Sequence, residues 1–155
     1  MNNRNLVREY DNTTVFFRPL NLNGIKYLGF TNCPVMHVIP VINGREGRSL
    51  TAKRCRLIFA GWDQLPNLKS LNFTSTPLQN INGLQNLCEL ELNRCELTTI
   101  LPEIFGLIHL CNLTLNRCQL TSIPPEIVRL NHLTDLDLTN NSLTNCRNLA
   151  GLVTL

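Results

Sequence analysis

Cysteine and histidine are the residue types in this chain that could do thiol or metal chemistry, and one short motif repeats a cysteine at a fixed interval. The octapeptide NRCELTTI at 93–100 returns as NRCQLTSI at 116–123. A cysteine beside an arginine in such a repeat could build a metal site, a reactive thiol or a row of binding residues. The elements that position the motif decide between these possibilities.

Two further pairs repeat at the same interval and superficially resemble a zinc set. Cys88 aligns with Cys111, and His109 aligns with His132. Two thiols and two imidazoles are the ligands that zinc prefers. The spacing, however, contains neither C-x-x-C nor H-x-x-x-H, and a repeat alone produces such coincidences. The sequence therefore predicts no metal.

Other chemical motifs are equally weak. The loop NGREGR at 43–48 is glycine-rich and basic, and such loops can cradle phosphate. It lacks the P-loop pattern, and glycine is useful here simply for turning the chain. Repeat asparagines and aspartates would give false matches to most catalytic patterns. We predict no catalysis and no cofactor.

A single template organises most of the chain and accounts for the repeated cysteine. The template is L-x-x-L-x-L-x-x-(N/C)-x-L, with units of 19–23 residues. Copies begin at residues 25, 47, 68, 87, 110 and 133, and a partial copy begins at Leu152. The Asn/Cys position holds, in order along the chain, Cys33, Cys55, Thr76, Cys95, Cys118 and Asn141.

This pattern resembles the leucine-rich repeat family, in its intracellular type, over residues 22–155. The resemblance implies an α/β solenoid of about six repeats plus a partial last one. A parallel sheet would form the concave side, and short helical or irregular returns the convex side. Pro102, Pro124 and Pro125 suit those returns, because a missing backbone N–H costs little there.

The physics of the pattern agrees with the resemblance. Leucine alternating with other residues is typical of a short strand with one buried face. One strand and its return cannot bury that face alone, so neighbouring repeats must stack into a continuous core. A leucine ladder of this kind explains why aromatic residues make up only 6% of the chain.

The repeat register gives the cysteines a structural role. The resemblance implies that the side chain at the Asn/Cys position points inward where the strand turns and satisfies backbone groups of the loop. A thiol does this weakly and also fills space as a small buried hydrophobe. We interpret Cys33, Cys55, Cys95 and Cys118 as structural residues.

The residues that point away from the core are the candidate binding residues. Arg54, Arg94 and Arg117 each precede a cysteine of the template, and with Lys53 and Lys69 they predict a basic stripe. Their charges could equally serve only to solvate an exposed sheet. The full set of candidate contacts is Tyr27, Lys53, Arg54, Asn72, Glu89, Glu91, Arg94, Thr114, Arg117, Asp135 and Asp137.

Charge is unevenly distributed along the chain. Residues 1–70 hold ten Lys/Arg and four Asp/Glu, whereas residues 71–155 hold four and seven. The basic half leaves open a nucleic-acid or phosphate-binding function, in which Tyr27, Arg48, Lys53, Arg54 and Lys69 would meet a phosphate backbone. The lack of stacked aromatics and the acidic strands on the same sheet argue against it.

Both ends depart from the template. We expect residues 1–21 to form an N-terminal cap, with 13–20 as a strand over the first repeat and the first dozen residues loose. The partial copy at Leu152 has no polar cap after it, which leaves an exposed sheet edge. A fragment of a longer protein, a homodimer through that edge, or a frayed end are the three explanations.

The sequence as a whole predicts a non-enzymatic recognition module. Its concave face would hold a protein partner, in the manner of an adaptor, a regulatory subunit or a substrate receptor. The polar N-terminus carries no signal peptide, no segment is apolar enough to span a membrane, and seven cysteines favour a reducing, cytoplasmic location. The alternatives are the nucleic-acid module above and a fragment of a larger leucine-rich repeat receptor.

Overall fold

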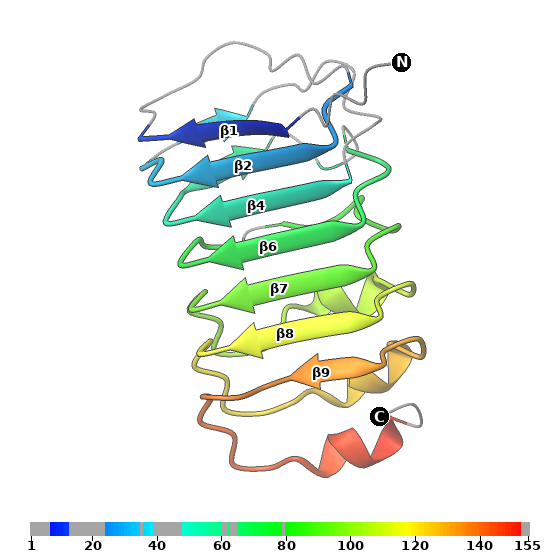
Figure 1. Ribbon diagram of the computed structural model, residues 1–155. Coiled ribbons are helices and arrows are strands. Elements are labelled where there is room, and N and C mark those ends of the chain that lie inside the picture. The colour runs from blue at the N-terminus through cyan, green and yellow to red at the C-terminus, as the bar shows by residue number, and fades with distance from the viewer. Residues whose placement is uncertain are drawn as a thin grey trace.

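Seven parallel strands stack in chain order into one sheet (Figure 1). The computed structural model describes residues 7–12, 24–34, 36–38, 48–59, 62, 65–78 and 80–152. The strands of the sheet are β1 (Val7–Asp11), β2 (Tyr27–Thr31), β4 (Ser49–Lys53), β6 (Ser70–Thr74), β7 (Glu89–Asn93), β8 (Asn112–Asn116) and β9 (Asp135–Asp137). The predicted solenoid with a parallel sheet is confirmed.

The strands pair without any register shift, so equivalent residues of successive repeats lie side by side. Leu50 pairs with Leu71, Leu71 with Leu90, and Leu90 with Leu113. These leucines are at most 1% exposed, and the alternate residues of the same strands point outward. The alternation in the sequence therefore sorts each strand into a core side and an outer side, as predicted.

The return segments on the other side of the core carry short elements. β3 (Met36–Val38) pairs in parallel with β5 (Leu57–Phe59), and three 3₁₀ helices lie within the continuously described residues 80–152. These are η3 (Pro102–Gly106), η4 (Pro125–Arg129) and η5 (Arg147–Gly151). None of the helices in the described ranges has the length and apolar composition needed to span a membrane.

Proline begins two of these helices. Pro102 and Pro125 lie in the first turns of η3 and η4, where the absent N–H would have no partner inside the helix. The backbone N–H of the following leucine, Leu107 or Leu130, closes the other end by donating to a helix carbonyl. The prediction that these prolines lie in the returns is confirmed.

The N-terminus corrects one expectation. The first dozen residues were expected to be loose, yet Val7–Asp11 forms β1, which pairs residue for residue with β2. The template missed this strand because Arg8 and Tyr10 stand where it requires leucine. The Tyr10 ring stacks on Phe30 at 5.4 Å between centroids. Residues 13–20 and 153–155 lie outside the described residues, and the domain boundary at residue 22 stays a prediction.

Candidate functional site

The outer face of the seven-stranded sheet, called here the open face, is built from three rows of side chains. Each five-residue strand points its first, third and fifth residues outward, and in-register pairing aligns them. The first row is Val7, Tyr27, Ser49, Ser70, Glu89, Asn112 and Asp135. The middle row is Glu9, Gly29, Thr51, Asn72, Glu91, Thr114 and Asp137. The third row is Asp11, Thr31, Lys53, Thr74, Asn93 and Asn116, and it is continued by Thr139, which lies two residues beyond β9 and accepts a hydrogen bond from the Asn116 side chain.

Negative charge concentrates in the first and middle rows. Neither row contains a lysine or an arginine, and together they contain five carboxylates. These are Glu9, Glu89, Glu91, Asp135 and Asp137. The open face is therefore acidic along its centre, most densely over β7 to β9.

Some of these carboxylates already have local partners. Asn72 donates its side-chain amide to Glu91, and the hydroxyl of Thr134 donates to Asp135 at 3.0 Å. Thr139 donates its backbone N–H to Asp137 at 2.8 Å. Hydrogen bonds from the hydroxyl and the backbone of Thr139 lower the pKa of Asp137, because they favour the charged form. This carboxylate keeps its charge at neutral pH.

Positive charge lies at the turn just beyond the third row. One residue per repeat occupies this position, called here the turn row: Asn12, Asn32, Arg54, Ser75, Arg94, Arg117 and Asn140. All seven adopt a left-handed backbone conformation, with φ of 54°, 56° and 54° at the three arginines. Asparagine tolerates this conformation well, whereas arginine adopts it at a cost.

The turn row uses its backbone for the fold and leaves its arginine side chains free. The N–H of Arg54 donates to Thr74, that of Arg94 to Asn116 and that of Arg117 to Thr139, at 2.9–3.2 Å. All three side chains are exposed. Within the described ranges, no side-chain hydrogen bond or salt bridge engages them. The guanidinium groups are therefore available to a ligand.

From Asn32 onward, the residue after each turn residue points toward the core, and these six positions form the inner ladder. Four of them are the repeat cysteines, which are at most 4% exposed. The thiol of Cys118 donates to Leu92 at 3.1 Å, and that of Cys95 donates to Phe73 at 3.5 Å. Burial raises the pKa of the Cys95 thiol to about 11 and also raises that of Cys118. The structural role predicted for the cysteines is thereby supported, because buried thiols with raised pKa are poor nucleophiles.

Thr76 and Asn141 hold the remaining positions of the inner ladder and satisfy more backbone groups. Asn141 donates to the carbonyls of Leu115 and Leu138, and its side-chain oxygen accepts from the N–H groups of Cys118 and Leu120. Thr76 accepts from the N–H of Cys55 at 3.1 Å. The asparagine and the threonine therefore accept from backbone N–H groups, which a thiol does only weakly.

The candidate residues named from sequence lie in different rows. Tyr27, Glu89 and Asp135 lie in the first row, and Lys53 lies in the third. The middle row holds Asn72, Glu91, Thr114 and Asp137, and the turn row holds Arg54, Arg94 and Arg117. The predicted basic stripe was wrong in including Lys69. This lysine precedes β6, at the opposite end of the strand from the arginines.

Sequence reasoning missed a second basic row. Lys26, Arg48 and Lys69 each precede a strand of the sheet and are aligned by backbone bonds. The N–H of Arg48 donates to Lys26 at 2.8 Å, and the N–H of Lys69 donates to Arg48 at 2.8 Å. All three residues are exposed. Their identical position in the template was the signal that could have revealed this row.

The histidine and cysteine pairs lie in the segments that lead into β7, β8 and β9. The rings of His109 and His132 stack with centroids 6.3 Å apart. Cys88 and Cys111 are half-buried, and each thiol donates to a carbonyl two residues earlier. In the described part of the chain, no group of three or more histidine, cysteine or acidic residues is arranged to hold a metal ion.

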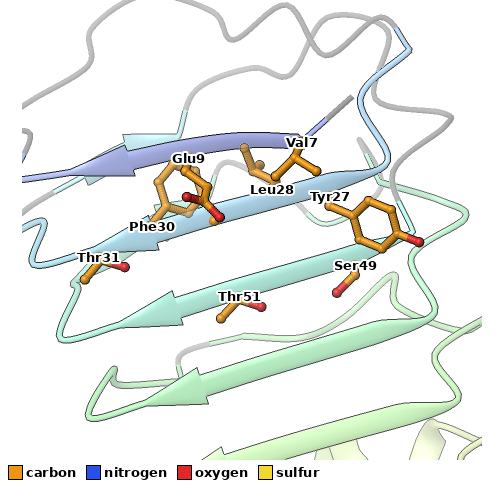
Figure 2. A pocket seen from close by; sticks show the side chains of 9 residues that line it. Val7, Glu9, Tyr27, Leu28, Phe30, Thr31, Ser49 and Thr51 are labelled. Atoms are coloured by element: carbon orange, nitrogen blue, oxygen red, sulfur yellow. The ribbon is translucent and has the colours of Figure 1, made fainter. Parts of the chain in front are cut away.

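Among the hollows of the described residues, two border the open face and the turns that follow its strands. The first, of about 250 Å³, lies over Gly29 on β2, between side chains of β1 and β4 (Figure 2). Val7, Glu9, Tyr27, Ser49 and Thr51 are among the residues that line it. The second, of about 280 Å³, lies at the turns after β6 and β7 and is lined by Arg94 and Glu96 among others.

Comparison with known proteins finds a family model that matches one repeat and solved structures with a similar fold. Residues 86–108 match the Leucine Rich Repeat family model. A solved internalin (InlF) from Listeria monocytogenes is similar, with a TM-score of 0.59 and 20% identity. That similarity covers 86% of this chain and 47% of the internalin, so the chain spans about half of that protein's length. No curated protein sequence matches the chain.

Two other solved structures show weaker similarity. A leucine-rich repeat protein of Leptospira interrogans has a TM-score of 0.40 and 19% identity, covering 84% of this chain and 53% of its own. The leucine-rich repeat domain of a type III effector (XopL) has a TM-score of 0.41 and 15% identity, and the similarity covers 97% of this chain and 74% of the effector domain.

Proposed function

We propose that this chain, whose residues 86–108 match the Leucine Rich Repeat family model and whose fold is similar to that of an internalin, is a non-enzymatic recognition module that holds a protein partner on its open face. Folds of this kind commonly mediate protein–protein interaction, since stacked repeats create an extended surface. In this proposal the face acts as an adaptor, regulatory or substrate-receptor surface. The candidate contacts are the eleven residues named from the sequence.

One observation carries the proposal: three arginines occupy turn positions whose backbone favours asparagine. Arg54, Arg94 and Arg117 adopt left-handed backbone conformations, and the equivalent positions elsewhere hold asparagine or serine. Their side chains are exposed and make no bond to any described residue. Binding gives these arginines a role that the fold does not.

The rows of charge specify the chemistry of the partner. A partner segment over the first and middle rows would present positive charge to the carboxylates, most densely to Glu89, Glu91 and Asp135. At the turn row it would present acidic groups to Arg94 and Arg117, which can accept carboxylates in a bidentate fashion. Such complementarity sets orientation and association rate more than total affinity.

The cellular setting is part of the proposal. All seven cysteines are free, which favours a reducing compartment and hence the cytoplasm. Homodimerisation through the outer edge of β9 stays a prediction, and sedimentation of the isolated chain would test it. Nucleic-acid binding through the basic rows remains the alternative function.

Affinity capture from a lysate of the source cell tests the proposed function. The bait is the wild-type chain, with Arg94→Asn/Arg117→Asn as the variant and Arg94→Lys/Arg117→Lys as a control that keeps the charge. Asparagine is the residue that other repeats carry at this position, so the variant removes charge without opposing the backbone. A nuclease-treated lysate is run in parallel.

The proposal expects a protein captured by the wild type, retained in part by the lysine variant and lost by the asparagine variant. Capture that disappears after nuclease treatment would instead favour the nucleic-acid alternative. Equal capture by all three baits would show that the arginines do not contact the partner.

A further inference from the structure

We propose that the hollow over Gly29 receives a lysine or arginine side chain from an extended segment of the partner. The inference rests on the proposed function, because the hollow lies on the open face, between β1 and β4. Tyr27 and Val7 would contact the aliphatic part of that side chain. The Glu9 carboxylate would bind its cationic end.

The size of the hollow suits one side chain. Its volume of about 250 Å³ lies below the range of about 300–1,000 Å³ that is typical of small-molecule pockets. The hollow exists because Gly29 has no side chain, whereas Thr51 and Asn72 fill the same row on the next two strands. The backbone does not require glycine here, since Gly29 is not among the described residues with positive φ.

The walls of the hollow combine apolar surface with a carboxylate. Tyr27 is 47% exposed and Val7 is 52% exposed, and both belong to the small set of large hydrophobic residues that remain open to solvent. Figure 2 shows Val7 and Glu9 on β1, Ser49 and Thr51 on β4, and Tyr27 on β2 between these two strands. A long side chain with an apolar stem and a charged tip meets both kinds of wall.

The negative charge of Glu9 favours a side chain whose end group is positively charged. Glu9 is the charged residue among those that line the hollow, and within the described ranges no side-chain hydrogen bond or salt bridge occupies it. A cation between Glu9 and the Tyr27 ring would gain an ion pair and a cation–π contact. Three basic residues are at the ends of the same strands: Lys26 precedes β2, Arg48 precedes β4 and Lys53 ends β4. All three are exposed, and none of them lines the hollow. Solvent and salt screen such exposed charges.

Titration with short peptides, followed by nuclear magnetic resonance of the ¹⁵N-labelled full chain, tests this inference without the natural partner. The probes are acetyl-Gly-Lys-Gly-amide, its arginine analogue, and analogues with norleucine or glutamate in the central position. We expect the lysine and arginine peptides to shift the amide resonances of Gly29 and Thr51 saturably. Norleucine has the same apolar stem without the charge and should shift them far less.

Two variants confine the effect to the hollow. Glu9→Gln should weaken binding of the lysine peptide by about tenfold, because the amide oxygen can still accept a hydrogen bond but no longer carries the negative charge that pairs with the ammonium group. Gly29→Thr should also weaken it, since threonine occupies this row on β4 and β8 and should fill the hollow without distorting the strand. Arg129→Gln, at an exposed position of η4 between β8 and β9, should leave peptide binding unchanged.

Equal shifts from lysine and norleucine, or lysine binding that survives Glu9→Gln, would overturn the inference. Saturable shifts confined to resonances outside the hollow would overturn it as well. Failure here is separable from failure of the proposed function. Partner capture that depends on Arg94 and Arg117 but not on Glu9 would retain the function and remove the lysine site.

Discussion

The two residues of the motif Arg-Cys are neighbours in sequence but lie in opposite environments, the cysteine in the core and the arginine in solvent. The cysteines of the inner ladder are buried and bond to backbone groups, and three of them have a raised pKa. The arginines of the turn row are exposed, make no side-chain bond to any described residue and adopt a conformation that favours asparagine. The cysteine is thus explained by the fold, whereas the arginine is not. Exposed residues that the fold does not require, such as these arginines, are the better candidates for a function.

The largest expected effect breaks the inner ladder at Asn141. Asn141→Ala removes the acceptor of two backbone N–H groups and the donor to two carbonyls, and should lower the free energy of unfolding by about 2–4 kcal/mol. Urea unfolding followed by circular dichroism measures the change. Asn141→Cys, which places the commoner ladder residue there, should lose about half as much. An alanine variant as stable as the wild type would contradict the role of the ladder.

A smaller loss is expected at Thr76, which is fully buried. Thr76→Val keeps the shape but leaves the N–H of Cys55 without its acceptor, and should cost about 1–3 kcal/mol. Thr76→Ser keeps the hydroxyl and should cost less than about 1 kcal/mol. The comparison of the two variants in thermal unfolding separates the hydrogen bond from the packing. If serine were the worse replacement, packing and not the hydroxyl would dominate.

The leucine core and the register of the sheet could be predicted from sequence because both follow from one repeated spacing. Leu90 and Leu113, for example, are buried because alternate residues of a strand point to opposite faces of the sheet, and the leucine positions all point to the core face. β1 was missed because Arg8 and Tyr10 replace the leucines of the template. Its pairing depends on contacts across repeats, such as Tyr10 on Phe30, that no local pattern encodes.

The candidate site was only partly accessible to the same reasoning. Template position identified the exposed arginines, but it gave no sign of their left-handed backbone or of the opposite placement of Lys69. The hollow over Gly29 was also invisible. It depends on Glu9 and Val7, which reach Gly29 only because β1 joins the sheet.

Thiol labelling sharpens the contrast between buried and exposed cysteines. At pH 8, iodoacetamide should modify exposed Cys146 quickly and Cys95 slowly, because burial raises the pKa of Cys95 to about 11 and blocks access. Peptide mass spectrometry over time gives the two rates, and urea should make them equal. Rapid labelling of Cys95 in the folded chain would contradict its structural role.

The same thiol should make stability sensitive to alkaline pH. The pKa of Cys95 is about 11 in the folded chain and about 8.5 when unfolded, so ionisation favours unfolding. Its contribution is complete below about pH 8.5 and is lost as pH rises toward 11. Cys95→Ala should show a shallower decline in the free energy of unfolding between pH 8.5 and 10. Equal slopes would remove Cys95 as a cause.

The smallest expected effect concerns the arginines, and it bears most directly on the central claim that the fold does not need them. The free energy of unfolding of Arg94→Asn/Arg117→Asn should equal that of the wild type or exceed it by up to about 1 kcal/mol, because asparagine suits the left-handed turn. Urea unfolding of the two chains, side by side at the same salt concentration, measures this difference. A loss of more than about 1 kcal/mol would instead make the arginines structural, and the reason for seeking a partner at the turn row would disappear.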